Sequence, residues 1–386
     1  MADYLFDGTQ ILKGSNVLIT DSWGKVENII PEDEAGQGIE VFKGLLSPGF
    51  VNAHCHLELS HLKNLIPERT GLPEFVTSVV QLRHFDQAEI TDAIKNAEDE
   101  MLDSGTVAVG DICNNAITIA QKENARIHYY NFIEASGWNP SVAETRFQKS
   151  CSYYGEFLQK NMKVSLVPHA PYSVSKNLWG KIAPYFDGKV ISIHNQETKD
   201  EDEYFLKGVG QLNQMYKNMN IDNSFYKIPG KRSLETYFEN FREAASVILV
   251  HNTFTKQEDL NYIFRTKSQN QLVSFCLCIN ANLYIENEVP PVDLFLQNDC
   301  NLVVGTDSLA SNHQLIILEE LKTIAEKFPN IATEVILQWA TSNGARALQM
   351  EHALGTFEKG KKPGVVLIEN LANDKLNKNS VSRRIL

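Results

Sequence analysis

The fold of this 386-residue chain is decided by one stretch, Leu46-Ser-Pro-Gly-Phe-Val-Asn-Ala-His-Cys-His56. It is a mainly apolar run of the kind that forms a buried strand, and it ends on two histidines one residue apart. Because side chains two positions apart on a strand share a face, His54 and His56 are expected to point the same way. Two imidazoles together at the end of a strand are typical of a metal site.

Seven further apolar runs follow along the chain, separated by stretches with helical spacing. They are Thr106–Cys113, Arg126–Glu134, Lys163–His169, Val190–His194, Val247–His251, Leu272–Ile279 and Asn301–Asp307. The stretch Ile90–Leu102 has helical periodicity and should end before Gly105. Alternating strands and helices indicate the α/β class with a parallel sheet. Eight such strands over roughly 260 residues predict a closed (β/α)8 TIM barrel, which we place at residues 47–354.

The two ends of the chain have a different pattern of short strands and turns. Asn16–Thr20 and Val365–Ile368 are the clearest strands in these segments. We therefore predict a small β-sandwich domain built from residues 1–46 together with residues 355–386. The longest connection between barrel strands, Glu197–Ser246, contains many charges and is predicted to be a lid or a substrate-facing loop.

Histidines and one aspartate mark the ends of five predicted strands. These residues are His54, His56, His169, His194, His251 and Asp307. The C-terminal ends of barrel strands meet at one mouth, where the active site lies. Three imidazoles and a carboxylate form a donor set that suits Zn²⁺, with iron or another first-row metal as alternatives. A single buried histidine usually belongs to the core, but the joint pattern favours a metal site.

Composition excludes several other classes of function. The formal net charge is −12 and no run of Lys or Arg could follow a phosphate backbone, so nucleic acid is disfavoured as a partner. No window approaches 18 consecutive apolar residues, and residues 1–10 do not resemble a signal peptide, so no membrane partner is expected. The six cysteines are scattered, which favours reduced thiols in a cytoplasmic protein.

The Leu46–His56 stretch resembles the opening strand of the amidohydrolase superfamily, in the branch of cytosine, guanine and S-adenosylhomocysteine deaminases and triazine hydrolases. Other segments are similar to later motifs of that branch: Pro168–Ser175, His194–Glu197, Leu249–Asn252, Gly305–Asn312, Trp339–Ala345 and Gly355–Lys361. Strand seven departs from the family pattern C-P-x-S-N. Here it is Cys278-Ile-Asn-Ala-Asn282, which leaves the shape of the substrate wall open.

The resemblance implies a metal-dependent hydrolytic mechanism. The ligands would be His54, His56, His194 and Asp307, around one divalent metal per chain, with Zn²⁺ expected and Fe²⁺ as the alternative. A metal-activated hydroxide would attack, Asp307 would act as base, Glu197 would shuttle the proton and His251 would hold the water. Dinuclear members carry a lysine at the end of strand four, where this chain has His169, so we predict one metal.

The resemblance also suggests which residues contact substrate and what the substrate is. The candidates for substrate binding are His169, Glu58, His61, Asn282 and Ser308. The expected substrate is a small amino-substituted nitrogen heterocycle, of adenosine-like, S-adenosylhomocysteine-like or aminofutalosine-like type, which loses ammonia. Relatives are often homodimers or larger, so a homodimer is a candidate assembly.

Two alternatives stay open at this point. One is a hydrolase of another C–N or C–Cl bond, of triazine chlorohydrolase or formimino type, because the fold alone does not separate these reactions. The other is a metal-binding homologue that has lost catalysis. This second alternative is disfavoured because Glu197, His251 and Asp307 are all present.

Overall fold

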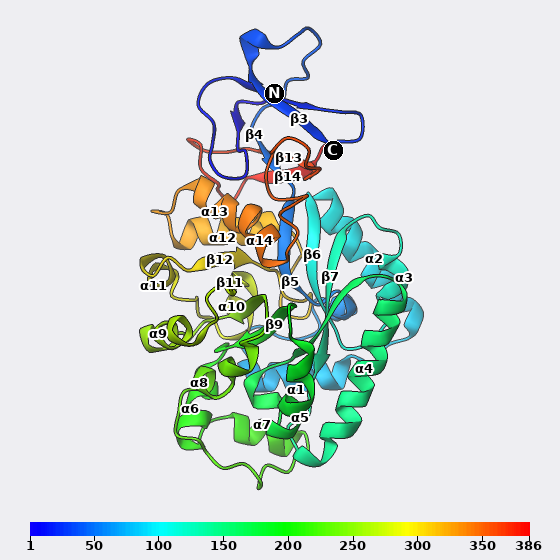
Figure 1. Ribbon diagram of the computed structural model, residues 1–386, viewed down its shortest axis with the longest axis vertical. Coiled ribbons are helices and arrows are strands. Elements are labelled where there is room, and N and C mark those ends of the chain that lie inside the picture. The colour runs from blue at the N-terminus through cyan, green and yellow to red at the C-terminus, as the bar shows by residue number, and fades with distance from the viewer.

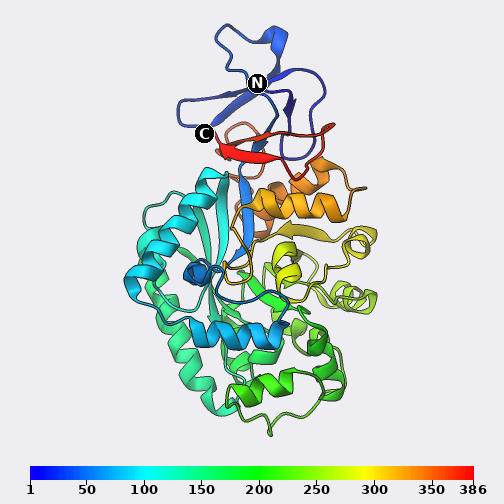
Figure 2. The ribbon, with the colours of Figure 1, turned by 180° about the vertical axis from the view of Figure 1, so that it is seen from behind.

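Both ends of the chain lie in one small strand domain, and the residues between them form a barrel (Figure 1). The computed structural model describes residues 1–386. The strand domain sits at the top of the view in Figure 1, on the barrel end where the first barrel strand begins. Figure 2 shows the arrangement from behind, with helices along the outside of the barrel strands.

The barrel strands form two four-stranded parallel sheets, in the orders β5-β6-β7-β8 and β9-β10-β11-β12. The strands are β5 (Phe50–Cys55), β6 (Thr106–Cys113), β7 (His128–Ala135), β8 (Lys163–Pro168), β9 (Val190–Asn195), β10 (Ser246–His251), β11 (Leu272–Leu277) and β12 (Asn301–Val304). Each coincides closely with one predicted run. The predicted α/β class and TIM barrel are therefore confirmed.

Two seams join these sheets and close the barrel. At the first, the His194 backbone N–H donates to the His169 carbonyl oxygen, with 3.0 Å between N and O. At the second, the Thr306 backbone N–H donates to the His54 carbonyl oxygen at 3.0 Å, and Cys55 pairs with Asp307 in an isolated parallel bridge. Each seam therefore holds side chains that were predicted for the metal site.

The first predicted strand was wrong in one respect, because Leu46–His56 is divided into two strands. β4 (Leu45–Pro48) pairs within the strand domain, whereas β5 enters the barrel. The chain crosses between them at Gly49, where a Cβ would lie 2.2 Å from Val107 Cγ1. Pro48 has no backbone N–H, and Gly49 is in tight contact with Val107. Together they interrupt the hydrogen-bond ladder of the strand at this point.

The strand domain combines one sheet and one hairpin. The sheet has the order β1-β4-β13-β14, and its other strands are β1 (Tyr4–Leu5), β13 (Val365–Glu369) and β14 (Val381–Arg384). The hairpin consists of β2 (Asn16–Thr20) and β3 (Val26–Pro31). A buried apolar cluster that includes Val26, Leu46 and Leu367 joins the two. Both chain ends thus share one β domain, and the boundaries at 1–46 and 355–386 stay a prediction.

The helices lie between successive strands and after the last one. They are α1 (Leu72–Leu82), α2 (Gln87–Asp103), α3 (Ile119–Lys122), α4 (Ala143–Gln159), α5 (Lys176–Ile182), α6 (Lys199–Lys207), α7 (Leu212–Asn218), α8 (Ser233–Tyr237), α9 (Gln257–Thr266), α10 (Ile279–Ile285), α11 (Val292–Gln297), α12 (Ile317–Lys327), α13 (Thr333–Trp339) and α14 (Ser342–Ala347). None of them combines the length and apolar character needed to cross a membrane. Helix α2 covers the predicted stretch Ile90–Leu102 and ends before Gly105. The φ of 107° at Gly105 is incompatible with an α-helix, so the helix cannot extend through this residue.

The connection from β9 to β10 differs from the predicted loop because much of it is helical. It contains α6, α7 and α8. Gly208, with a φ of 72°, ends α6 as a left-handed cap. Met215 and Tyr216 on α7 line the cavity described below, so this connection does face the site. Whether it opens and closes stays a prediction.

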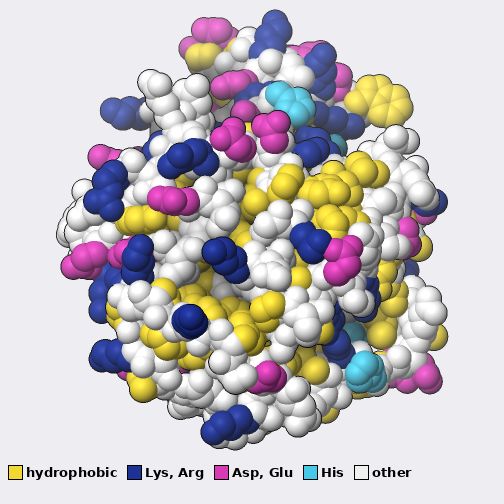
Figure 3. Space-filling view, turned by 60° about the horizontal axis from the view of Figure 1, so that its bottom comes forward, with side chains coloured by type: hydrophobic (Ala, Val, Ile, Leu, Met, Phe, Trp, Pro, Cys, Tyr) yellow, Lys and Arg dark blue, Asp and Glu magenta, His cyan; other side chains and the backbone are white.

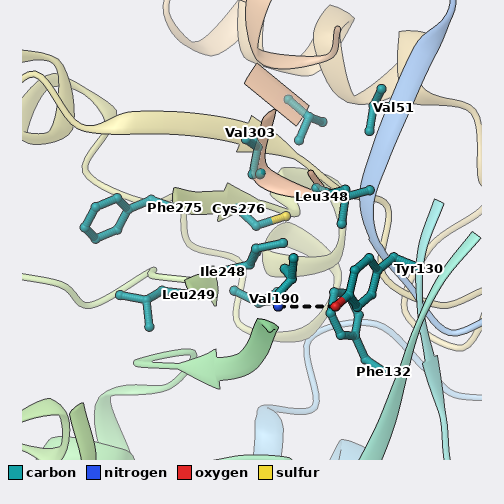
Figure 4. Close-up of a cluster of buried hydrophobic side chains, with 14 of the residues drawn as sticks. Val51, Tyr130, Phe132, Val190, Ile248, Leu249, Phe275, Cys276, Val303 and Leu348 are labelled. Atoms are coloured by element: carbon teal, nitrogen blue, oxygen red, sulfur yellow. Dashed lines mark hydrogen bonds between the residues drawn. The ribbon is translucent and has the colours of Figure 1, made fainter. Parts of the chain in front are cut away.

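One apolar cluster fills the barrel and the layer between strands and helices (Figure 4). Val51, Phe132 and Ile248 are among its fully buried members. Each such side chain contributes about 1.5–3 kcal/mol by leaving water. The Val190 backbone N–H donates to the Tyr130 hydroxyl at 3.2 Å, the bond drawn in Figure 4. This dense packing fixes the strands, and with them the side chains at the strand ends.

We predict that Gly305→Ala weakens the seam between β12 and β5. A Cβ at Gly305 would lie 2.9 Å from the His54 Cβ, the His54 carbonyl oxygen and the Cys276 Sγ, so β12 must move away. The free energy of unfolding, measured by chemical denaturation, should fall by about 1–3 kcal/mol. The control Gly155→Ala, in α4 with no atom within 4 Å of its Cβ, should be neutral or stabilising. Equal stability of Gly305→Ala and wild type would contradict this packing.

Candidate metal centre and active site

The centre begins with the two histidines at the end of β5. His54 lies within the strand and His56 follows its last residue. As expected from the two-residue spacing, their rings approach each other, with 3.2 Å between the two Nε2 atoms. Both side chains are buried. The first barrel strand therefore presents two imidazole nitrogens to one point at the mouth.

His194 brings a third imidazole from β9. Its Nε2 lies 3.3 Å from the His56 Nε2. Its Nδ1 lies 2.8 Å from the His169 carbonyl oxygen, which can only accept a hydrogen bond, so the Nδ1 carries the proton. The Nε2 is then the lone-pair nitrogen that a metal requires. The seam between β8 and β9 thus sets both the position and the tautomer of this ring.

Asp307 adds a carboxylate just past the end of β12. Its Oδ1 lies 3.5 Å from the His54 Nε2 and 3.3 Å from the His56 Nε2. Its Oδ2 accepts a hydrogen bond from the Ser311 hydroxyl at 2.6 Å. Asp307 has a φ of 58°, a left-handed conformation that residues other than glycine adopt at a cost of about 1–3 kcal/mol. The fold thus holds this carboxylate in an unfavourable backbone geometry that turns it toward the imidazoles.

A divalent cation fits the resulting set of donors. The His56 Nε2 lies within hydrogen-bonding distance of the Nε2 atoms of both His54 and His194. One proton shared among these nitrogens can form a hydrogen bond between only two of them. A cation at this point would satisfy all three lone pairs and the nearby carboxylate, as in three-nitrogen, one-oxygen zinc sites. The ligand atoms of His54, His194, His251 and Asp307 all lie within 4.8 Å of one another. The chain therefore contains a metal-binding group of histidines and an aspartate.

Glu197 stands beside His251, a member of this group. Glu197 follows β9, and its Oε1 lies 3.5 Å from the His251 Nε2. The His251 Nδ1 donates to the Asn282 Oδ1 at 2.8 Å, which leaves its Nε2 free to accept a proton. Burial raises the pKa of Glu197 well above its ordinary value, and the charge of Asp307 adds to the effect. A raised pKa favours the protonated carboxyl, which can act as a general acid.

His56, His194, Glu197, His251 and Asp307 line a cavity of about 730 Å³. Glu58, His61, His169 and Ser308, which were predicted to contact substrate, line the cavity. Further apolar and aromatic side chains form its wall, among them Leu59, Phe75, Trp138, Tyr172, Met215 and Tyr216. Figure 3 looks at the end of the barrel away from the strand domain, where hydrophobic side chains gather between scattered charged groups. The cavity can enclose a small, flat molecule next to the metal-binding group.

Asn282 does not lie where the sequence interpretation placed it. It does not line the cavity but sits behind His251 and accepts its hydrogen bond. The physical reason is that this residue lies on α10, where its side-chain Oδ1 and Nδ2 are both bonded to His251 at the end of β10. Its observed contact is that of a residue that positions His251.

The sequence interpretation missed three polar residues of the site. Ser311 holds Asp307, Glu134 and Asn114 line the cavity, and Glu134 comes from the end of β7. The signal for Glu134 was present, because it ends the predicted run Arg126–Glu134. A single acid at the end of a strand is common at protein surfaces, whereas the histidine pattern is rare. The roles of all these residues as ligands, catalysts or substrate contacts stay predictions.

Comparison with known proteins agrees with the predicted resemblance. The model of the amidohydrolase family matches residues 45–385. Adenosine deaminase of Helicobacter pylori is 25% identical over 324 residues, which is 82% of this chain and 77% of that protein. The crystal structure of H. pylori aminofutalosine deaminase with methylthio-coformycin has a TM-score of 0.81 and 22% identity, and the match covers 96% of this chain and 92% of that one. An adenosine deaminase from Xanthomonas campestris with bound zinc has a TM-score of 0.69 and 21% identity, covering 95% and 83%.

We predict that Ser311→Ala weakens metal binding. The Asp307 Oδ2 would lose its hydrogen-bond donor, and partners of this kind commonly contribute 10- to 100-fold to metal affinity. Competition with a chelator measures the change, and the control Ser152→Ala, on the exposed side of α4, should bind metal like wild type. An unchanged affinity in Ser311→Ala would show that Asp307 needs no support or is not a ligand.

Proposed function

This chain belongs to the amidohydrolase family, and we propose that it is a hydrolytic deaminase. Its substrate is a small nitrogen heterocycle of purine type that bears an exocyclic amine, and the products are ammonia and the corresponding carbonyl compound. The observation on which the proposal rests is the Glu197 carboxyl beside His251, in the cavity that His56, His194 and Asp307 also line. The adenosine deaminase relative and the other deaminases that the chain resembles support this reaction class.

The metal in this proposal is one divalent ion per chain, with Zn²⁺ preferred over Fe²⁺. His54, His56, His194 and Asp307 would hold it, and their nitrogen-rich donor set is of the kind that zinc favours. The zinc bound by the X. campestris relative supports the choice. When bound, the ion acts as a Lewis acid and lowers the pKa of a water molecule to about 7.

The side chains around the metal-binding group can move every proton that the reaction needs. The Asp307 carboxylate accepts the proton that the attacking water loses. Glu197, protonated because it is buried, donates to a ring nitrogen as the neighbouring carbon becomes tetrahedral. Asp307 then passes the water's first proton to the amine, and ammonia departs as the C–N bond breaks. The hydroxyl left on that carbon loses its proton as the carbonyl forms, and this proton restores the Glu197 carboxyl. His251 accepts from the water through its Nε2, an orientation that Asn282 maintains.

The cavity wall supports a small aromatic substrate. Trp138 stacks on Tyr216, with 5.5 Å between ring centroids and an interplanar angle of 4°. Both line the cavity together with Tyr172 and Phe75. Aromatic walls favour flat heterocycles by apolar burial and by stacking.

Ammonia release by the zinc-loaded protein tests the proposal. We expect release from at least one member of a panel of adenosine-like, guanine-like and cytosine-like amines. Glu197→Gln should lower the rate by about 10²- to 10⁴-fold while zinc content stays at one per chain, because the amide cannot donate the proton. The control Glu203→Gln makes the same chemical change at an exposed position of α6 and should keep wild-type activity.

Two results would contradict the proposal. Absence of ammonia release over the whole panel with zinc bound would point to another C–N or C–Cl bond as the target. Full activity in Glu197→Gln would show that the proton comes from elsewhere. Loss of ammonia release after chelation, with recovery on adding Zn²⁺, is the expected companion result.

A further inference from the structure

Gln196, the residue before the proposed proton donor Glu197, has a strained backbone. Its φ is 46°, a left-handed conformation that residues other than glycine seldom adopt. Gln196 is buried and does not line the cavity, whereas Glu197 does. The backbone at Gln196 therefore sets the direction in which the Glu197 side chain leaves β9. A conformation of this kind persists only where neighbouring contacts hold it.

Two contacts hold Gln196 from the segment that follows β10. Its backbone carbonyl oxygen accepts the Phe254 N–H, with 3.0 Å between N and O. Its side-chain Oε1 accepts the Thr255 hydroxyl at 2.7 Å. Thr255 is itself buried and does not line the cavity. Gln196 is thus bonded, through its backbone and through its side chain, to the few residues that come directly after His251.

A pair of buried asparagines makes the same connection one residue earlier. The Asn252 backbone N–H donates to the Asn195 carbonyl oxygen at 3.0 Å, and the Asn195 Nδ2 donates to the Asn252 Oδ1 at 2.9 Å. The Asn195 Oδ1 accepts the Tyr237 hydroxyl at 2.5 Å, which fixes the orientation of this amide. Four hydrogen bonds therefore join the end of β9 to the segment after β10. We call the residues that form them the latch: Asn195, Gln196, Asn252, Phe254 and Thr255.

The first turn of α6 supports the latch from a second direction. The Gln196 backbone N–H donates to the Glu201 Oε1 at 3.2 Å, and the same oxygen accepts the Ser233 hydroxyl. Burial raises the pKa of Glu201 to about 8, which favours its neutral carboxyl. The Oε1 can accept both hydrogen bonds without carrying a charge. Both polar groups of the Gln196 backbone and its side-chain oxygen are therefore bonded.

A purely structural role is the competing explanation for the latch, because buried polar networks often make a fold more rigid. Its position in the chain favours a more specific role. Glu197 directly follows Gln196, and His251 directly precedes Asn252. The side chains of Glu197 and His251 line the cavity and lie 3.5 Å apart, measured from Oε1 to Nε2. No member of the latch lines the cavity.

We infer that Gln196 and Thr255 are positioning residues, which fix the Glu197 carboxyl relative to His251 and to the ring nitrogen that receives its proton. The inference rests on the proposed function, in which Glu197 is the proton donor. A proton donor must come within about 2.6–3.2 Å of its acceptor, and a displacement of about 1 Å can slow a reaction about 10²-fold. Because the latch does not line the cavity, it should affect the rate for bound substrate and leave substrate binding unchanged.

Thr255→Val tests the latch, because it removes one hydroxyl and keeps the shape of the side chain. In zinc-loaded protein, kcat for ammonia release from adenosine, or from the amine that the wild type prefers, should fall by about 10- to 100-fold. KM and zinc content should not change. Thr255→Ser keeps the hydroxyl and should retain most of the wild-type kcat. The matched control Thr91→Val removes a hydroxyl that donates to the Gln87 carbonyl oxygen at 2.8 Å on the exposed side of α2, and should react like wild type.

A double-mutant cycle shows whether Thr255 acts through Glu197. In protein that already carries Glu197→Gln, adding Thr255→Val should lower kcat by no more than about twofold, because the proton donor has been removed. Loss of kcat by the same factor with and without Glu197→Gln would assign Thr255 a structural role and overturn the inference. An unchanged kcat in Thr255→Val, or a kcat in Thr255→Ser as low as that in Thr255→Val, would overturn it as well.

Amide hydrogen exchange separates this inference from the proposed function, because it needs no reaction. The backbone N–H groups of Gln196 and Phe254 should exchange about 10-fold faster in Thr255→Val, and at the wild-type rate in Thr255→Ser and Thr91→Val. Faster exchange in a protein that releases no ammonia from any amine would support the latch and contradict the deaminase. Ammonia release together with wild-type exchange and wild-type kcat in Thr255→Val would support the deaminase and overturn the latch.

Discussion

The closure of the barrel is the constraint on which the rest of the molecule depends. Where β12 meets β5, the His54 carbonyl accepts the Thr306 N–H, and where β8 meets β9, the His169 carbonyl accepts the His194 N–H. These bonds join the strands that carry the imidazoles and Asp307. Zinc–nitrogen bonds are about 2.0–2.1 Å long, so a shift of an ångström at either seam would separate the donors beyond coordination. The apolar core supplies the rigidity that prevents such a shift.

This arrangement is costly for the chain without its ion. His251 and Asp307 have φ values of 73° and 58°, and three imidazole nitrogens meet at one buried point. Such conformations persist only where the surrounding structure determines them fully. Without a cation, the site combines strained backbone conformations with several electron-pair donors in close contact. Binding of a cation to this site stabilises the folded state, because binding is linked to folding. Stability and catalysis therefore depend on the same few strand ends.

Most of the polar site could be predicted from one rule, that side chains at the C-terminal ends of parallel barrel strands meet. The rule placed His54, His194, His251 and Asp307 together, although the chain separates them widely. It failed for Glu134, which also ends a strand, because the chain has 48 acidic residues and a single one is not distinctive. It failed for Asn282 because this residue belongs to a helix behind the strand end, and helix packing cannot be read from residue spacing.

The sequence by itself determined the class of the fold, the order of the strands and which histidines and aspartate meet at the mouth of the barrel, because each depends on local periodicity and on residue type at the end of a strand. Only the tertiary structure decided where the first run divides at Gly49, which proton His194 holds, and how Gln196 and Thr255 join the end of β9 to the segment after β10. These features depend on distances between segments far apart in the sequence. Such distances are set by packing and barrel closure, and no local pattern of residues encodes them.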